Sequence, residues 1–283
     1  MKDPAEKSFV ARDGLEVAYL EWGRPSDRPS VVMVHATGFC KELSTPIVDD
    51  LHEQWGPAHV VAIDQRAHGD SGTPPVPFDW WDVGRDLVEL VGEWSRVVGV
   101  GHSAGGAALV LAELTAPATF DAFVLVEPIM FPPPYGRYPD NPMAVAARRR
   151  RRRFESRAGA HENWSSKPAF AGWQTRAMDS YVAGGLRSVA DGVVLKCTPE
   201  SEAEFFIAAT DHGAWDRLDE IDVETTIVAG EHSTTHREPF LGALAGRMRK
   251  CSAVVVPDTS HMVWMERPEV IAGHVATSLD KLG

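Results

Sequence analysis

The sequence predicts an α/β fold in which helices cover both faces of a mostly parallel sheet. Short, almost continuous apolar runs recur along the chain, as in strands that are buried on both faces. Helix-like segments separate these runs, and such alternation is typical of a parallel sheet. The chain has 283 residues, of which 44% are hydrophobic and 24% charged. These values indicate a globular protein that is long enough to bury a core without disulfides.

The elements can be predicted in order along the chain. A hairpin with strands at 8–12 and 15–22 surrounds the turn residues Asp13 and Gly14. Six further runs, such as SVVMVHA and AFVLVE, predict buried strands, at 30–36, 59–64, 96–101, 122–127, 225–229 and 252–256. The segments between them predict helices, at about 42–55, 80–94, 104–116, 237–249 and 267–281. The prediction is therefore an eight-stranded sheet.

The alternation breaks once, between Phe131 and about Asp222. This stretch opens with three prolines and contains no convincing buried strand, but it is rich in aromatic residues. We interpret residues 131–222 as a helical cap, or lid, inserted after the sixth strand, and residues 1–130 and 223–283 as the core. Its aromatic residues are Phe154, Trp164, Phe170, Trp173, Tyr181, Phe205, Phe206 and Trp215.

The charge balance excludes some partners. Acidic residues outnumber basic ones by 40 to 28, for a formal net charge of −12. This balance argues against nucleic acids and membranes as partners, because they need a basic surface. The exception is a run of six arginines, Arg148 to Arg153, inside the cap. On a helix these side chains face in several directions, so we expect a solvated lid helix. Two alternatives stay open. The run could bind an anion at the mouth of the pocket, or one or two of its arginines could turn inward to a carboxylate.

The cysteines and the chain's amino-terminal residues bear on localisation. Cys40, Cys197 and Cys251 are far apart and odd in number, which favours free thiols in a reducing compartment. The first residues lack the apolar stretch of a secretory signal, and no window approaches 18 apolar residues. We therefore expect a cytoplasmic protein that acts on a small molecule, with a homodimer left open. No metal constellation or phosphate-binding glycine loop indicates a cofactor.

The sharpest motif is Gly101-His102-Ser103-Ala104-Gly105, which matches G-x-S-x-G. A serine on a tight strand-to-helix turn needs small neighbours two positions away on either side, because the backbone there is strained. The strand-like run RVVGVG precedes the motif and the helix-like run AALVLAEL follows it. The pattern predicts that Ser103 is a nucleophile and that the Ala104 N–H belongs to an oxyanion hole. The alternative is a serine that only caps the following helix.

With three further segments in the expected order, the chain resembles the α/β-hydrolase superfamily, in its capped serine-hydrolase branch. These segments are HATGF at 35–39, DQRAHGDS at 64–71, and SHM at 260–262 followed by ERP. The resemblance covers nearly all of the chain. It implies that His261 is the base that a serine nucleophile needs, in the order serine, acid, histidine. It also implies that Thr37 supplies the second oxyanion N–H, with Gly38 as the alternative.

The position of the acid that should orient His261 departs from the family pattern. The usual loop, after the seventh strand, reads Gly230-Glu231-His232-Ser233, so that a serine stands where the aspartate is expected. Glu231 in that loop is one replacement. The other is Glu127 at the end of the sixth strand, where some branches, including lactonases of the zearalenone-cleaving type, place the acid. We favour Glu127, because a carboxylate ending an apolar strand needs a partner. A structural pairing with a cap arginine is its alternative role.

The resemblance implies hydrolysis of a carboxylic ester or lactone through an acyl-enzyme, as in carboxylesterases and lactonases. Serine at position 103 argues against haloalkane dehalogenases and epoxide hydrolases of the same fold, which use aspartate there. The cap aromatics favour a small to medium, largely apolar substrate. A thioesterase and a carbon–carbon-bond hydrolase stay open as enzymes. A non-hydrolytic small-molecule receptor and a degenerate member of the fold stay open as alternatives outside catalysis.

Overall fold

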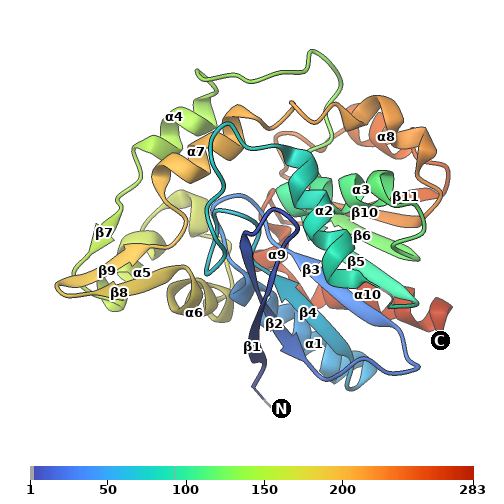
Figure 1. The fold of residues 1–283 in the computed structure, drawn as a ribbon, viewed down its shortest axis with the longest axis horizontal. Coiled ribbons are helices and arrows are strands. Elements are labelled where there is room, and N and C mark those ends of the chain that lie inside the picture. The colour runs from blue at the N-terminus through green and yellow to red at the C-terminus, as the bar shows by residue number, and fades with distance from the viewer. Residues whose placement is uncertain (1–2, 93) are drawn as a thin grey trace.

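In a computed structural model, which describes residues 3–92 and 94–283, an eight-stranded sheet forms the centre of the protein (Figure 1). The strand order is β1-β2-β4-β3-β5-β6-β10-β11. Neighbouring strands from β4 to β11 are parallel, whereas β2 is antiparallel to both of its neighbours. The predicted fold class is therefore confirmed. The strands are β1 Ala5–Val10, β2 Glu16–Trp22, β3 Ser30–Val34, β4 His59–Ile63, β5 Val97–His102, β6 Ala122–Val126, β10 Glu224–Gly230 and β11 Cys251–Val256.

Helices cover both faces of this sheet and divide the core into two layers. Successive side chains of a strand point to opposite faces. Accordingly Val32 and Val34 of β3 join one hydrophobic cluster with α2, α3 and α8, and Val31 and Met33 join the other with α1, α9 and α10. The helices are α1 Thr45–Trp55, α2 Trp80–Val91, α3 Ala104–Thr115, α8 Phe240–Ala245, α9 Val263–Glu266 and α10 Pro268–Leu282. A 3-10 helix, Lys41–Ser44, precedes α1.

Several predicted elements differ in their limits by a few residues, and two of them show why. The first hairpin strand ends at Val10 instead of residue 12, because Ala11 to Gly14 form a hydrogen-bonded turn in which Gly14 has a φ of 89°. The helix predicted over 237–249 is reduced to α8, which follows Pro239 and ends before Gly246. Proline and glycine interrupt helices, and this pair limits α8 to six residues. Glu93, inside the helix predicted over 80–94, lies outside the described residues.

The segment 131–222 differs from the prediction in one respect, because it combines helices with a small sheet. Its three strands pair antiparallel in the order β7-β9-β8. Each is four residues long or shorter, so none gives the continuous apolar run by which the core strands can be recognised. The elements are α4 Pro142–Arg148, β7 Arg153–Phe154, α5 Arg157–Ser165, α6 Thr175–Gly184, β8 Leu186–Val189, β9 Gly192–Leu195 and α7 Pro199–Ile207, with 3-10 helices Pro168–Phe170 and Ala214–Glu220.

This segment lies beside the carboxyl ends of the parallel strands (Figure 1). It leaves the core after β6 and returns before β10. Its rings Phe154, Trp164 and Tyr181 join the hydrophobic cluster of the face that α1 and α10 cover. The segment is thus packed on the core. Within residues 3–92 and 94–283, no helix combines the length and the apolar character that crossing a membrane requires.

Candidate active site

Ser103 lies on the sharp turn between β5 and α3. Its φ of 52° and ψ of −109° are a conformation that L-residues rarely adopt. The surrounding backbone holds it, because the Ser103 N–H donates to the Val126 carbonyl at 2.8 Å and its own carbonyl accepts from Gly106, Ala107 and Ile129. The side chain is almost buried, with 8% exposed. A strained residue that its surroundings fix so completely is typical of functional sites.

The glycines of this turn allow three backbone segments to meet. A Cβ atom on Gly105 would lie 2.1 Å from the Val34 carbonyl oxygen and 2.8 Å from that of His35. A Cβ atom on Gly101 would lie 2.6 Å from the backbone of Gly105. The start of α3 therefore touches the loop that follows β3, and no side chain fits between them.

Gly105→Ala should destabilise the fold, because rigid backbone has to move to accept the methyl group. Forcing atoms into a filled space costs about 1–3 kcal/mol. Thermal unfolding, followed by circular dichroism, should therefore show a clear fall in Tm. Gly273→Ala is the matched control, since the Cβ atom meets nothing closer than 3.5 Å there and alanine favours a helix. Equal Tm values for the two variants would contradict this account of the turn.

The loop after β3 lies next to Ser103, since β3 and β5 are parallel neighbours that pair Val34 with Gly101. Thr37, the sequence-predicted oxyanion donor, is in this loop and is nearly buried. The Gly38 N–H, its alternative, already donates to His68 Nε2 at 2.9 Å. Among the described residues, the N–H groups of Thr37 and Ala104 make no hydrogen bond. This arrangement leaves the Thr37 and Ala104 amides available for a ligand.

His261 follows β11 and reaches the end of β6. Its Nδ1 atom lies 2.8 Å from Oε2 of Glu127, and 30% of its side chain is exposed. Its carbonyl oxygen accepts a hydrogen bond of 2.9 Å from Nε2 of His102, the residue next to Ser103. Burial, followed by the influence of His261, lowers the pKa of His102 to about 3, so that its ring is a neutral donor. His102 therefore ties the histidine loop to the serine turn, a role that the sequence did not predict.

Glu127 is fully buried directly after β6, in a backbone conformation with a φ of 49°. Its Oε1 accepts from the Gly230 N–H at 2.8 Å, and its Oε2 accepts from the Ser233 hydroxyl at 2.7 Å. Burial alone would raise the pKa of Glu127, but hydrogen bonds from His236 and His261 outweigh it and hold this pKa well below its usual range. Ser233, at the position expected for an aspartate, thus contacts the carboxylate that approaches His261 from another strand.

Glu231 does not take part in this arrangement. Its side chain is exposed, and its Oε2 accepts from the backbone N–H of Asp258 at 3.0 Å. Among the described residues, the carboxylate that contacts the His261 ring is Glu127. Of the two acids that the sequence left open, the structure therefore brings only Glu127 to His261.

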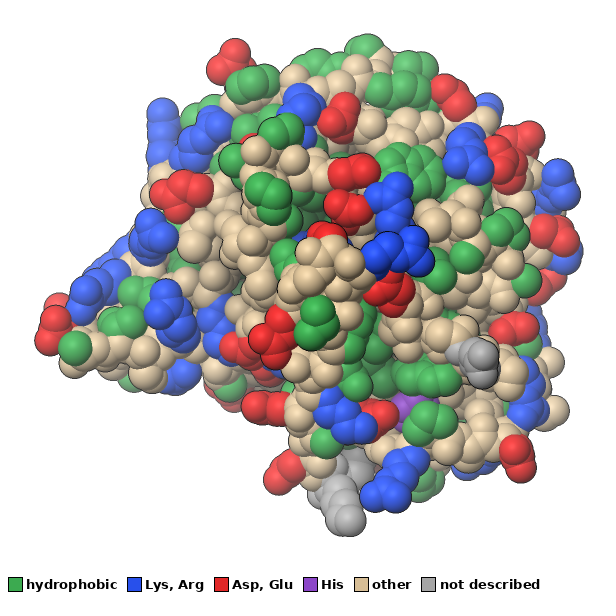
Figure 2. Space-filling model, in the orientation of Figure 1, with side chains coloured by type: hydrophobic (Ala, Val, Ile, Leu, Met, Phe, Trp, Pro, Cys, Tyr) green, Lys and Arg blue, Asp and Glu red, His purple; other side chains and the backbone are tan. Residues whose placement is uncertain are grey.

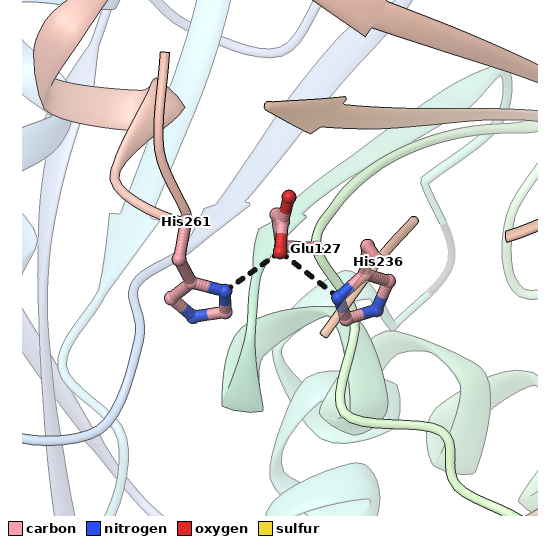
Figure 3. Close-up of side chains that lie close together, drawn as sticks. All are labelled: Glu127, His236 and His261. Carbon is pink, nitrogen blue, oxygen red and sulfur yellow. Dashed lines mark hydrogen bonds and ion pairs between the residues drawn. The ribbon is translucent and has the colours of Figure 1, made fainter. Parts of the chain in front are cut away.

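A second histidine, His236, contacts the same oxygen of Glu127 (Figure 3). Its Nδ1 is 2.9 Å from Oε2, and its Nε2 is 2.9 Å from the Pro128 carbonyl oxygen. The ring is fully buried, and the Thr235 hydroxyl oxygen lies 2.9 Å from its Nδ1 atom. The backbone N–H of His236 donates to the Ser233 hydroxyl oxygen. His236 holds the carboxylate from the side opposite to His261 (Figure 3). No local motif signals this role, because the contact joins residues 109 positions apart in the chain.

The same three side chains could also hold a metal ion, since one oxygen and two nitrogens lie within 4.8 Å of one another. The distances of 2.8 and 2.9 Å from nitrogen to oxygen are hydrogen-bond lengths. A metal would also replace the proton on His261 Nδ1 that binds Glu127. The residues therefore fit a hydrogen-bonded acid–base pair better than a resident metal. A second group, Glu231, His232 and Asp258, is exposed.

Comparisons with known proteins show which family the chain belongs to and which solved structures share its fold. A family model described as "Alpha/beta hydrolase family" matches residues 31–274. The type I acyl-CoA thioesterase mpaH' of Penicillium brevicompactum is 29% identical over 136 residues, which are 43% of this chain and 31% of that protein. The chain thus spans about a third of the length of this relative.

Two solved structures have the same fold. E-2-(acetamidomethylene)succinate hydrolase superimposes with a TM-score of 0.81 at 19% identity, over 98% of this chain and 99% of the other. The thioesterase domain from the curacin biosynthetic pathway also gives 0.81, at 17% identity, over 97% of this chain and 99% of the other. At these identities the likeness describes the fold and leaves the reaction open.

Proposed function

The chain belongs to the alpha/beta hydrolase family, and from that premise we propose that it is a serine hydrolase of a carboxylic ester or lactone. The observation that carries the proposal is the 2.8 Å hydrogen bond between Glu127 and His261, whose carbonyl oxygen is bonded to His102, the neighbour of a serine in a strained turn. A histidine oriented by a carboxylate is what a serine hydroxyl needs to become a nucleophile. Ser103, His261 and Glu127 are the proposed catalytic residues.

The proposed reaction has two halves. Ser103 Oγ attacks the carbonyl carbon while His261 Nε2 takes the hydroxyl proton, and the negative oxygen of the tetrahedral intermediate accepts from the Thr37 and Ala104 N–H groups. The bond to the leaving alcohol then breaks, and His261 returns the proton to that oxygen. Water attacks the acyl-enzyme with His261 as the base, which releases the carboxylic acid and restores Ser103. Glu127 holds the Nδ1–H and stabilises the imidazolium in both halves.

The proposed substrate is small to medium in size and largely apolar, and residues 131–222 act as its lid. Phe39 of the loop after β3 meets Trp173 of the lid edge-on, with ring centroids 5.4 Å apart. Both rings are half-buried, and Phe39 lies two positions beyond Thr37. They offer an apolar wall near the proposed oxyanion hole, which suits an acyl or alcohol group without charge.

A thioester is the second candidate, and the comparisons favour it. One curated relative is named as an acyl-CoA thioesterase and one solved structure as a thioesterase domain. A thioester has the same carbonyl centre and a better leaving group, so the same residues would act in the same order.

We place the protein in the cytoplasm, where its three free thiols would stay reduced.

Hydrolysis of a substrate panel tests the proposal. The panel holds p-nitrophenyl esters of increasing acyl length, aliphatic and aromatic lactones, and short and long acyl-CoA thioesters. We expect turnover of esters or lactones with a higher kcat/KM for apolar acyl groups. Turnover of acyl-CoA alone would make the thioesterase the better description. A chain that cleaves none of them would contradict a hydrolytic function and favour a receptor.

A further inference from the structure

The arginine run contains one member that turns inward. Five of the six side chains are exposed, whereas that of Arg150 has 22% of its surface exposed. Basic side chains gather along the edge of the molecule that α4 and the strands β7 to β9 occupy (Figure 2). Arg151 to Arg153 contact groups on this edge, such as Glu200 and Asp191. Arg150 is thus the run's link to the interior.

Arg150 joins two further elements of the lid. Its Nη1 forms an ion pair with Glu202 of α7, and its Nη2 donates to the Tyr181 hydroxyl of α6 at 2.7 Å. Glu202 and Tyr181 are themselves buried, with 7% and 1% exposed. A buried ion pair of this kind is costly to break, because one charge would be left without a partner.

The chemistry of arginine fixes the direction of the next hydrogen bond. A guanidinium has donors only, so the Tyr181 oxygen accepts from Arg150 and keeps its own proton for another acceptor. That acceptor is the Gly38 carbonyl oxygen, at 3.1 Å. Burial raises the pKa of Tyr181 to about 12, so the hydroxyl stays protonated at neutral pH. Arg150 therefore orients a donor at the loop after β3.

Hydrogen bonds and close side chains fix the backbone of Gly38. Its N–H donates to His68, its carbonyl accepts from Tyr181, and its φ is 83°. A Cβ atom at this position would lie 2.7 Å from Oε1 of Glu202 and 3.1 Å from Nη1 of Arg150. Both peptide groups that follow Thr37 are thus fixed, and one of them is fixed by the lid.

We infer that Arg150 is a positioning residue, which acts through Tyr181 and Gly38 to hold the Thr37 amide in the geometry of an oxyanion hole. The lid is then part of the catalytic centre as well as its cover. The inference rests on the proposed function, because it assigns the purpose of this network to that reaction. Such a network stabilises the transition state more than the bound substrate, because the negative charge on the oxygen develops only as the reaction proceeds.

Tyr181→Phe and Arg150→Gln test the network. Tyr181→Phe removes one oxygen and leaves the ion pair between Arg150 and Glu202 intact. Both variants should lower kcat by about 10- to 100-fold with little change in KM, because a misplacement of about 1 Å can cost about 100-fold. Their affinity for benzeneboronic acid, whose serine adduct imitates the tetrahedral intermediate, should fall by the same factor. Arg149→Gln, an exposed neighbour in the run, should keep wild-type values.

The double variant shows whether the two residues act in one path. If they do, Arg150→Gln adds little to the loss already caused by Tyr181→Phe. Arg150→Lys, which restores a charge beside Glu202, should recover part of kcat. Circular dichroism and Tm control for folding, and Tyr181→Phe carries the test if Arg150→Gln does not fold.

Two results would overturn the inference in an active chain. One is kcat values for Tyr181→Phe and Arg150→Gln that equal those of Arg149→Gln. The other is a loss confined to KM, which would indicate a role in substrate binding alone. Failure of the proposed function looks different, because the wild-type chain itself would then show neither turnover nor boronate binding, and the inference would fall with it.

Discussion

Glu127→Gln should lower kcat by a factor on the order of 10⁴, the loss known for an amide in place of a triad carboxylate. The amide has the shape of the acid but no charge, so it cannot stabilise the imidazolium of His261. Its NH₂ group would also face donors, since the Gly230 N–H, the Ser233 hydroxyl and His261 Nδ1–H approach the two oxygens. Steady-state hydrolysis of the best ester of the panel measures the effect.

Glu231→Gln is the control for this experiment. Glu231 is the other acid that the sequence allows, and it lies exposed in the loop after β10. We expect wild-type turnover from this variant. A large loss in Glu231→Gln, combined with tolerance of Glu127→Gln, would contradict the assignment of the acid. Circular dichroism shows whether the Glu127→Gln variant, which is changed at a buried position, keeps the fold.

Ser103→Ala should remove the activity almost entirely, by a factor on the order of 10⁶, as expected when a nucleophile of such a triad is lost. No acyl-enzyme can form without the hydroxyl, and the remaining rate comes from the oxyanion amides and from binding. The substitution itself is small, and the Ser103 side chain makes no capping hydrogen bond to α3 that the fold would lose.

Ser165→Ala, in an exposed serine of α5, is the matched control and should leave kcat unchanged. Substrate binding separates catalysis from folding, because Ser103→Ala should bind a slow substrate with nearly the wild-type affinity. Residual turnover close to that of Ser165→Ala would show that another group attacks the substrate.

Much of the fold can be predicted from the sequence, because strands that are buried in a parallel sheet consist of continuous apolar runs. The runs at β3 and β6 are examples, and Thr37 and Glu127 follow their carboxyl ends. The small sheet within residues 131–222 could not be predicted, since β8 and β9 have four residues each and are only partly buried. The limits of α8 depend on Pro239 and Gly246, which interrupt an otherwise helical pattern.

The site could be predicted only as far as local motifs reach. The turn around Ser103 is encoded within five residues, and the position of His261 after the last strand follows from chain order. The partners of Glu127 come from separate loops, and nothing local to His236 indicates that its ring lies 2.9 Å from that carboxylate. Likewise, the arginine run gives no sign that Arg150 is the member that faces inward, because six identical neighbours differ only in where the fold directs them.

Labelling with a fluorophosphonate tests the central claim most directly, because the reagent reacts with a serine only when a base activates it. Intact-protein mass spectrometry and peptide mapping would locate the adduct. The account predicts one adduct per chain on Ser103, formed at a much lower rate in Glu127→Gln and absent in Ser103→Ala. An unlabelled wild-type chain, or an adduct that persists in Ser103→Ala, would contradict it.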